Sequence, residues 1–211
     1  DYLANSISNK IKLPVKSIRN LITTQNLTSD ALAHAEKLFL EEKYTNKFKI
    51  ASVGRLVKSK GVLDIIEFAE YLKEKNFDFV WYIFGDGELK NEIENKIIEK
   101  NLSEHLFLKG FVDNVDSYLK QFDLLVSFSY SEGLGLIIKE AIQANIAVAT
   151  TPLPAFIEQL GDTGLYADHG DYDKWYQEIM LKLQSEQLRD KVVLSQTNHF
   201  LGKISSAFKT T

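Results

Sequence analysis

Short apolar segments alternate with longer segments of helical periodicity along most of the chain. Residues 48–53 and 77–84 are rich in β-branched or aromatic residues and stop at Gly54 and Gly85, as buried strands do where they enter turns. Shorter strand candidates lie at 106–108, 124–128 and 146–150, and helical patterns separate them at 62–74, 89–99, 115–121, 134–144 and 155–160. This alternation predicts right-handed βαβ units, and therefore an α/β fold with a Rossmann-like, doubly wound parallel sheet.

The regions outside this alternation differ from it in character. Residues 1–47 hold a basic segment at 10–19 and then a predicted helix at 29–43, which Ser29 or Asp30 would cap. We interpret residues 1–47 as a connector or the tail of another domain, residues 48–187 as the α/β domain, and residues 188–211 as a helical segment outside the sheet. Because the sequence starts at Asp1 rather than at methionine, we expect it to be part of a longer protein.

The composition narrows the classes of protein to which the chain can belong. With 211 residues, 45% of them apolar and 26% charged, the chain has the composition of a globular protein with one full core. It contains no apolar run long enough for a membrane span, and residues 1–5 lack the features of a signal peptide, so we expect a cytoplasmic protein. The net charge of −4 argues against nucleic acid as a partner.

Thiol and metal chemistry are not expected. The chain has no cysteine, and its histidines are too far apart in sequence to suggest a pair of metal ligands. These histidines are His34, His105, His169 and His199. Any site for an anion must therefore be built from local basic residues and backbone amides.

The turn after the first predicted strand carries three cations. Ligands of open parallel sheets bind beyond the carboxyl ends of the strands, so this turn is a candidate site. Gly54 would allow a tight turn, and Arg55, Lys58 and Lys60 would lie beside the amino end of the next helix, where free amides favour an anion. A phosphate or diphosphate would fit there, but a solvated basic loop explains these residues equally well.

The turn after the second predicted strand resembles part of a dinucleotide-binding motif. Gly85 and Gly87 match its first two glycines, but the third position is Lys90. Because no glycine permits close helix packing there, the pattern favours structural turn glycines and argues against a nicotinamide-binding module.

The segment SEGLGLIIKEA at residues 131–141 carries a glutamate near each end and two glycines between them. If a helix begins near residue 134, Glu140 shares an apolar face with Leu136 and Ile137, so a hydrogen-bonding partner is expected for it. Glu132 and Glu140 would lie roughly 12 Å apart in helical spacing, too far for a glycosidase carboxyl pair. They would instead hold two parts of a hydroxyl-rich ligand, with Gly133 and Gly135 admitting it to the backbone amides. The alternative is structural, with Glu132 as a helix-terminal charge and Glu140 in an ion pair with a lysine.

Taken in order, these motifs resemble the nucleotide-sugar-binding C-terminal domain of GT-B glycosyltransferases, in particular the retaining family 4 enzymes (glycosyl transferases group 1). The matching motifs are Gly54-Arg55-Leu56 with Lys60-Gly61, Gly85-Asp86-Gly87-Glu88-Leu89, Gly110-Phe111-Val112, and Ser129 through Ala141. The resemblance covers residues 48–175, with a weaker likeness at 1–25 to the end of the family's N-terminal domain. The sequence departs from the family at Phe128, where proline is frequent, and at Asn145, where glycine is frequent; asparagine can still adopt the left-handed conformation.

The resemblance implies roles for individual residues. Arg55 and Lys60 would hold the donor diphosphate and offset the charge that grows on the leaving nucleoside diphosphate, and Glu132 would contact the transferred sugar. These three are the implied catalytic residues. Glu140 would accept hydrogen bonds from the ribose hydroxyls, and the backbone near Val112 would read the base. The other implied donor-binding residues are Gly54, Gly133, Leu134, Gly135 and Leu136.

The sequence therefore predicts the donor-binding half of a retaining glycosyltransferase, which moves a hexosyl group from a UDP-sugar or GDP-sugar to a glycan or lipid-linked acceptor. The resemblance implies that the enzyme needs no metal or other cofactor. It also implies that the acceptor binds mostly to the missing N-terminal domain, so this piece alone would have little activity. The complete protein is expected in the cytoplasm, with peripheral contact to the inner face of the cell membrane as a further expectation. A nucleotide-sugar epimerase on a related fold and a non-catalytic nucleotide-binding module remain as alternatives.

Overall fold

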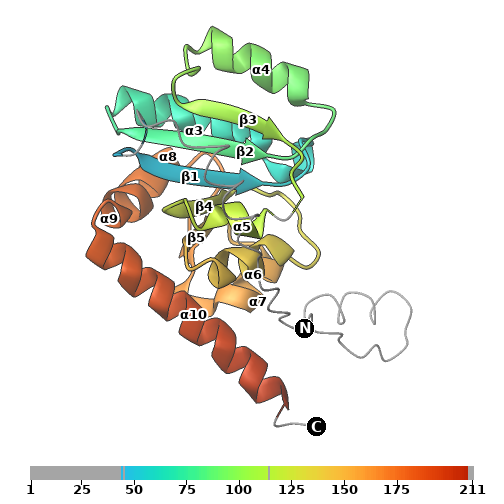
Figure 1. Ribbon diagram of the computed structural model, residues 1–211, viewed down its shortest axis with the longest axis vertical. Helices are drawn as coiled ribbons and strands as arrows, with labels where there is room; N and C mark the ends of the chain where they lie inside the picture. Colours follow the sequence, from blue (N-terminus) through green and yellow to red (C-terminus); the bar gives the residue numbers. More distant parts are fainter. Residues whose placement is uncertain (1–43, 45, 114, 209–211) are drawn as a thin grey trace.

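A computed structural model of the chain describes Tyr44, residues 46–113 and residues 115–208. The predicted helix at 29–43, the basic segment at 10–19 and the family likeness at 1–25 lie outside the described residues. Within them the chain forms a six-stranded parallel sheet with helices on both faces (Figure 1). The predicted doubly wound α/β fold is therefore confirmed.

The strands lie in the order β3-β2-β1-β4-β5-β6. Their bounds are Phe48–Val53 for β1, Phe79–Phe84 for β2, Leu106–Gly110 for β3, Leu124–Ser127 for β4, Ala147–Thr150 for β5 and Leu165–Tyr166 for β6. β1 pairs with β2 over its whole length and with β4 on its other side. The five predicted strands are confirmed with small shifts in their ends, whereas the two-residue strand β6 was not predicted.

The main helices follow the strands in the predicted places. They are α3 (Val62–Glu74), α4 (Lys90–Glu99), α5 (Asp116–Leu119), α6 (Leu136–Gln143), α7 (Pro154–Leu160) and α10 (Glu186–Phe208). Short helical turns complete the chain at η2 (Lys58–Lys60), η3 (Gly161–Thr163), α8 (Tyr172–Lys174), the π-helix η4 (Trp175–Met180) and α9 (Leu181–Leu183). The segment from α8 to α9 was not predicted.

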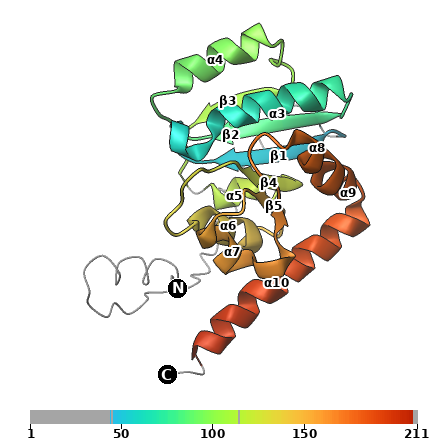
Figure 2. The ribbon, with the colours of Figure 1, turned by 180° about the vertical axis from the view of Figure 1, so that it is seen from behind.

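Two hydrophobic clusters cover the two faces of the sheet. Successive side chains of β2 alternate between them: Phe79, Trp81 and Ile83 join one cluster, and Val80, Tyr82 and Phe84 join the other. The first cluster includes residues of α3, α4, η4 and α9, and the second includes residues of α5, α6, α7 and α10. The helix α3 lies nearer the viewer in Figure 2, which shows the first of these faces. A strand buried on both faces is what a parallel sheet with helical crossovers requires.

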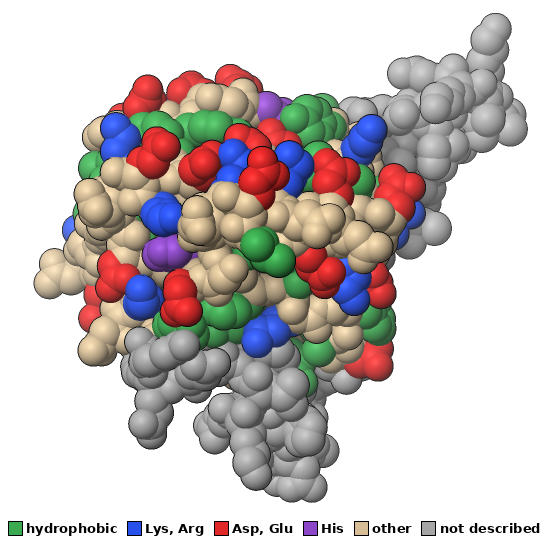
Figure 3. All heavy atoms as spheres, turned by 90° about the horizontal axis from the view of Figure 1, so that it is seen from above, with side chains coloured by type: hydrophobic (Ala, Val, Ile, Leu, Met, Phe, Trp, Pro, Cys, Tyr) green, Lys and Arg blue, Asp and Glu red, His purple; other side chains and the backbone are tan. Residues whose placement is uncertain are grey.

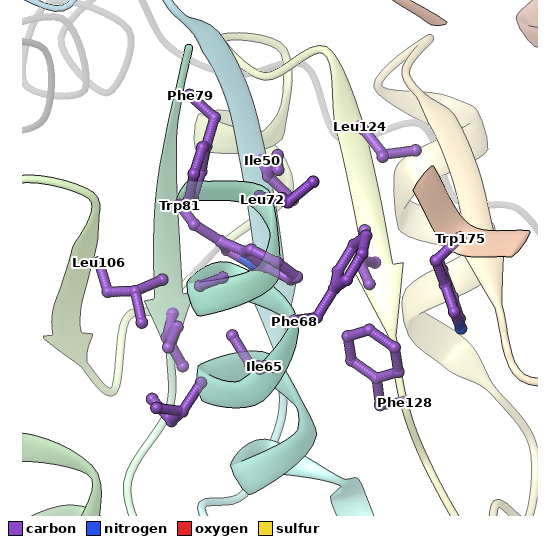
Figure 4. Close-up of a cluster of buried hydrophobic side chains, with 14 of the residues drawn as sticks. Ile50, Ile65, Phe68, Leu72, Phe79, Trp81, Leu106, Leu124, Phe128 and Trp175 are labelled. Atoms are coloured by element: carbon purple, nitrogen blue, oxygen red, sulfur yellow. The ribbon is translucent and has the colours of Figure 1, made fainter. Parts of the chain in front are cut away.

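Aromatic side chains fill the centre of the first cluster (Figure 4). Phe68 of α3 lies between Trp81 and Phe128, with ring centroids 6.1 and 5.9 Å away and near-perpendicular ring planes. The ring of Trp175, in η4, packs against the ring of Phe128, with the ring centroids 4.5 Å apart. Such edge-to-face contacts add to the free energy gained from burial. They anchor the segment after β4, because Phe128 is the first residue of the loop that follows this strand.

The C-terminal helix α10 crosses the β5 side of the sheet (Figures 1 and 2). Gln196 attaches it there: the side-chain carboxamide accepts a hydrogen bond from the Val148 amide and donates to the carbonyls of Val148 and Thr163. Gln196 is almost fully buried, so these bonds satisfy a side chain that would be costly to bury alone. Within the described residues, no helix has both the length and the apolar character to cross a membrane.

Charges of both signs are mixed on the face seen in Figure 3, which views the molecule from the α4 end. Its Lys and Arg side chains lie among Asp and Glu side chains and form no area of a single sign among the coloured atoms. A concentration of cations must therefore be sought at particular loops.

Candidate functional site

The order of the strands places a crevice between β1 and β4. The chain moves from β1 toward β3 on one side and from β4 toward β6 on the other, so the direction of winding reverses between these two strands. Ligands of doubly wound sheets bind outside the carboxyl ends of the strands at this point. The loops after β1 and β4, which carry most of the predicted site residues, begin on either side of it.

These two loops touch along their backbones. Gly61, at the start of α3, has a φ of 63°, and a Cβ atom there would lie 1.9 Å from the carbonyl oxygen of Phe128. The Tyr130 amide donates a hydrogen bond to the Ser59 carbonyl at 2.9 Å. A side chain at position 61 would push the loops apart, so glycine is required for their contact.

The three predicted cations of the β1 loop have different surroundings. Arg55 and Lys58 are exposed, whereas only 21% of the Lys60 side chain is accessible. Lys58 and Lys60 bound the short helix η2, which leads directly into α3. Lys58 and Lys60 therefore lie next to the amino end of α3, as predicted for them.

The backbone bends at Gly54, but glycine is not required for this bend. Its φ is not positive, and a Cβ atom there would make only an ordinary contact with Lys60 Cγ at 3.8 Å. The constraint lies instead at Gly85, where φ is 139° and a Cβ atom would lie 1.9 Å from the Gly54 carbonyl oxygen. The local sequence around Gly54 does not reveal this close approach, because it comes from the loop after β2.

The loop after β2 supports the loop after β1. The Leu56 amide donates to the Asp86 carbonyl at 2.9 Å, and the Leu89 amide donates to the Leu56 carbonyl at 3.0 Å. A Cβ atom at Gly87 would lie 2.6 Å from the Leu56 carbonyl oxygen. These contacts agree with the interpretation of Gly85 and Gly87 as structural turn glycines.

Lys60 and Glu132 form the central ion pair of the crevice. Lys60 Nζ lies 2.5 Å from Glu132 Oε2, and 18% of the Glu132 side chain is accessible. Glu132 Oε1 accepts a second hydrogen bond from the Gly133 amide at 3.1 Å. Two predicted catalytic residues are thus brought into direct contact from separate loops.

The helix after β4 begins two residues later than predicted. Gly135 precedes α6 in the left-handed conformation, with φ 59° and ψ 41°, and the Gln159 side chain donates to the carbonyls of Leu134 and Gly135. Glu132 therefore lies in a loop, so the separation of 12 Å, which assumed helical spacing, does not apply. The first turn of α6 has no acidic residue to occupy its amides, and it lies on the carboxyl side of β4.

Glu140 lies on α6, but not on its core face. The buried residues of α6 are Ile138, Ala141 and Ile142, whereas Leu136 is 47% exposed and Glu140 is half-buried. The apolar face that Glu140 shares with Leu136 and Ile137 is thus only partly buried and borders solvent at Leu136. Asn145, after α6, has a φ of 56°, so the left-handed conformation expected there is confirmed.

The predicted base-reading segment follows β3. Gly110 has a φ of 71° and its carbonyl accepts a hydrogen bond from the Gly85 amide at 2.7 Å. Val112 is half-buried against the second hydrophobic cluster, whereas its neighbour Phe111 is 72% exposed. An exposed ring at the carboxyl edge of the sheet is a surface on which a planar base can stack.

Two hollows lie beside the contact between the loops. A cavity of about 20 Å³ next to Lys60 is lined in part by the hydroxyl-bearing residues Ser52, Ser127 and Ser129, and its size suits roughly one water molecule. An open pocket of about 440 Å³ is lined by Lys58, Ser59, Gly61, Leu63, Asp64 and Tyr130. The larger volume falls in the range of small-molecule sites.

A cluster of three side chains next to the ion pair was not predicted. The Tyr130 hydroxyl donates to the Asp64 carboxylate, and the Tyr130 ring stacks on the His169 ring with centroids 3.6 Å apart. Burial, followed by the nearby Asp64 charge, raises the pKa of the Tyr130 phenol, which favours its protonated, donating form. Tyr130 stands between Ser129 and Glu132 of the recognised motif, but Asp64 and His169 are far away in sequence and left no local signal.

Solved structures share this fold. A mutant of Staphylococcus aureus TarM, crystallised with Fondaparinux, alpha-GlcNAc-glycerol and UDP, matches 95% of this chain and 39% of its own, with a TM-score of 0.76 and 23% identity. The C-terminal domain of a glycosyl transferase group 1 family protein (LpcC) from Francisella tularensis matches 74% of this chain and 86% of its own, with a TM-score of 0.65 and 24% identity. Both place the chain in the fold of a GT-B glycosyltransferase domain.

Characterised proteins are similar in sequence. A poly(ribitol-phosphate) alpha-N-acetylglucosaminyltransferase of Staphylococcus aureus (strain COL) is 30% identical over 152 residues, which are 72% of this chain and 28% of that protein. An Escherichia coli UDP-Gal:alpha-D-GlcNAc-diphosphoundecaprenol alpha-1,3-galactosyltransferase is 30% identical over 167 residues, 70% of this chain and 41% of that protein. The chain thus spans less than half the length of these two relatives.

The family assignment rests on most of the sequence. Residues 34–196 match the family described as glycosyl transferases group 1, and this range contains the loops after β1, β2, β3 and β4. The chain belongs to the glycosyl transferases group 1 family, and its fold is that of a GT-B glycosyltransferase domain.

Proposed function

We propose that this chain is the donor-binding half of a retaining glycosyltransferase that transfers a hexosyl group from a nucleoside-diphosphate sugar to a glycan or lipid-linked acceptor. The observation that carries this proposal is the contact of Lys60 with Glu132 at the reversal point of the sheet. It places a cation for a phosphate group and a carboxylate for sugar hydroxyls in the crevice where doubly wound sheets bind nucleotides.

The diphosphate would bind at the β1 loop. The half-buried Lys60 ammonium and the exposed Arg55 guanidinium lie in the loop that leads into α3. When the bond between the anomeric carbon and the diphosphate breaks, negative charge grows on the leaving group, and these cations would stabilise that charge. Because they supply positive charge, we also propose that transfer requires no divalent metal or other cofactor. Full activity in the presence of a chelator such as EDTA is expected.

The sugar and ribose would bind along the β4 loop and α6. Binding of the diphosphate to Lys60 would release Glu132 from its ion pair and free its carboxylate for a hydroxyl of the transferred sugar. The amides from Gly133 to Leu136 lie between Glu132 and the first turn of α6, where a helix attracts negative charge. Glu140 follows one turn later on the half-exposed side of α6 and would accept hydrogen bonds from the ribose.

The base would bind beyond β3, against the backbone of Val112 and beside the exposed ring of Phe111.

The acceptor would bind mostly to the part of the protein that precedes this chain, so we expect the 211-residue piece alone to bind donor weakly and to transfer little sugar. The Escherichia coli relative quoted above is named for a GlcNAc-diphosphoundecaprenol acceptor and the Staphylococcus aureus relative for poly(ribitol-phosphate), which supports a lipid-linked or polymeric acceptor.

The test is a calorimetric titration of the full-length protein with UDP, GDP and NAD. Binding of one nucleoside diphosphate is expected, weakened roughly tenfold by Arg55→Ala and by Glu140→Ala, since each removes a charged hydrogen-bonding group. Lys58→Ala removes an exposed cation from the same loop and serves as the control, with little effect expected. Absence of nucleoside-diphosphate binding, or binding that neither variant weakens, would overturn the proposed site.

The reaction itself is tested with the nucleotide sugar whose nucleoside diphosphate binds. Release of nucleoside diphosphate should depend on an acceptor glycan, and the anomeric configuration of the product, read by NMR coupling constants, should match that of the donor. A changed sugar formed without acceptor would identify an epimerase instead. Nucleotide binding without either reaction would identify a non-catalytic module.

A further inference from the structure

We propose that Asp64, Tyr130 and His169 act together as positioning residues that hold Glu132 in place for the transferred sugar. This inference rests on the proposed function, because it assigns to these side chains an effect on the same donor site. None of the three was part of the predicted site. They come from α3, from the loop between β4 and α6, and from the loop between β6 and α8.

The three side chains contact one another directly. The Tyr130 hydroxyl lies 3.1 and 3.2 Å from the two oxygens of the Asp64 carboxylate. His169 Nδ1 lies 3.3 Å from Asp64 Oδ1, so a protonated Nδ1 donates to the same carboxylate. The rings of Tyr130 and His169 are almost parallel, at an angle of 7° and a centroid distance of 3.6 Å. Asp64 therefore receives two hydrogen bonds from a pair of stacked rings.

The surroundings favour these contacts over solvent. Only 14% of the Asp64 side chain and 27% of the His169 side chain are accessible. Hydrogen bonds to a charged group that is largely removed from water are stronger than those between neutral, exposed groups. Tyr130 itself is more exposed and borders the open pocket, so its position depends on the contacts with Asp64 and His169.

Tyr130 connects this cluster to the catalytic ion pair. Its amide donates to the Ser59 carbonyl, and Ser59 is adjacent to Lys60, while Tyr130 is two residues before Glu132. The same pair of loops is therefore joined in two ways: first by the amides of Tyr130 and Ser131, which both donate to the Ser59 carbonyl, and second by the ion pair of Lys60 and Glu132. When a donor diphosphate binds to Lys60, the ion pair between Lys60 and Glu132 is lost. The cluster then keeps the β4 loop, and Glu132 with it, against the β1 loop.

The cluster should thus affect transfer more than nucleotide binding. Tyr130→Phe keeps the ring but removes the hydroxyl, and in the full-length protein it should lower kcat roughly tenfold, the size expected for one hydrogen bond to a charged group. The affinity for the nucleoside diphosphate should stay within about twofold, because Lys60 and Arg55 are unchanged. Asp64→Asn keeps an acceptor oxygen and should retain more activity than Asp64→Ala. His169→Phe, which keeps an aromatic ring, should likewise retain more activity than His169→Ala.

A double-mutant cycle separates positioning from a general loss of stability. If Tyr130 acts through Glu132, Tyr130→Phe should change kcat by less than about twofold when Glu132→Gln is already present. The control is Tyr71→Phe. Tyr71 lies on α3, like Asp64, and this variant removes the hydrogen bond that the Tyr71 hydroxyl donates to Asp173. It should leave kcat unchanged in both backgrounds.

The outcomes separate this inference from the proposed function. Failure of the wild-type protein to bind any nucleoside diphosphate contradicts the proposed function itself. The positioning role alone is overturned if the wild-type protein binds nucleotide and transfers sugar but Tyr130→Phe leaves kcat unchanged. The same holds if Tyr130→Phe lowers kcat by the same factor with and without Glu132→Gln. A fall in kcat for Tyr71→Phe equal to that for Tyr130→Phe would also overturn it, since the effect would then be one of stability.

Discussion

Lys60 and Glu132 are separated by 72 positions in the sequence, yet the Lys60 ammonium lies 2.5 Å from the Glu132 carboxylate across the reversal point of the sheet. With about a fifth of each side chain accessible, the pair is partly shielded from water. An ion pair of this kind contributes about 1 kcal/mol or less to stability. Under the proposed function, each partner would bind a different part of the donor, Lys60 the diphosphate and Glu132 the transferred sugar.

Lys60→Ala should weaken binding of the nucleoside diphosphate by about tenfold to a hundredfold, because a hydrogen bond between charged groups is worth roughly 1.5–3 kcal/mol. The melting temperature should fall little, since the ion pair itself contributes little to stability. Calorimetric titration and thermal unfolding measure the two effects. The exposed neighbour variant Lys58→Ala is the control, and equal losses of affinity in both variants would show that the loop acts only through its overall charge.

Glu132→Gln should change binding and catalysis in opposite directions. The variant removes the carboxylate that competes with the diphosphate for Lys60, so nucleoside-diphosphate affinity should rise by about twofold to fivefold, the worth of a partly exposed ion pair. The value of kcat should fall, because the charged contact to the transferred sugar is lost.

Glu88→Gln is the matched control for the Glu132 variant. Glu88 is exposed in the loop after β2. Its replacement by glutamine therefore removes one negative charge from the same edge of the sheet and leaves the ion pair of Lys60 unchanged. Its affinity and kcat should both remain close to wild type. A loss of nucleotide affinity in Glu132→Gln would contradict the competition for Lys60.

The sheet could be predicted because its longer strands are short apolar runs, two of which stop directly at glycine, as Phe79–Phe84 before Gly85 illustrates. The strand β6 could not, since two half-buried residues give no periodic pattern. The segment around Trp175 was missed for another reason. Its buried residues lie on a π-helix between two short α-helices, and this change of helical period obscures the spacing by which an amphipathic helix is recognised.

The site was predictable only in part, for a reason of topology. The sequence identified Lys60 and Glu132 separately, each in a turn after a strand, but not their ion pair, because the pairing depends on which strands are neighbours. Asp64 and His169 are separated from Tyr130 by 66 and 39 positions and have ordinary local surroundings, so the cluster emerges only when the helix α3 and two loops meet. The exposure of Leu136 on α6 was not predictable either, because the spacing of residues along a helix shows which of them share a face but not which face packs on the sheet.

Gly135→Ala should destabilise the protein by roughly 1–2 kcal/mol, the cost of the left-handed conformation for a residue with a side chain. The added Cβ atom would also lie 2.7 Å from Gln159 Nε2 and 3.1 Å from the Phe156 ring. Thermal unfolding should show a fall of about 2–8 °C for a protein of this size. Gly133→Ala is the control, because a Cβ atom there meets no atom within 4 Å and φ is not positive. Equal melting temperatures for the two variants would contradict the constraint at Gly135.

Tyr172→Phe should make the protein more resistant to unfolding at alkaline pH. Burial, followed by the charges of Asp64 and Glu67, raises the pKa of the Tyr172 phenol to about 12 from an ordinary value of 10.0. The folded state thus favours the neutral phenol, and this contribution to stability is complete below pH 10 and is lost as the pH rises toward 12. Phenylalanine cannot ionise, so the urea midpoint of the variant should exceed that of the wild type at pH 11 and equal it at pH 8.

The contrasting variant is Tyr166→Phe. Burial and the Asp162 charge raise the pKa of the Tyr166 phenol to about 12 as well, but its hydroxyl also donates a hydrogen bond to the Gly161 carbonyl at 2.9 Å. This variant should therefore lose stability at pH 8 and regain part of the difference at pH 11. Unfolding midpoints for Tyr172→Phe that are identical to wild type at both pH values would show that the Tyr172 phenol ionises in the folded protein as readily as in the unfolded chain.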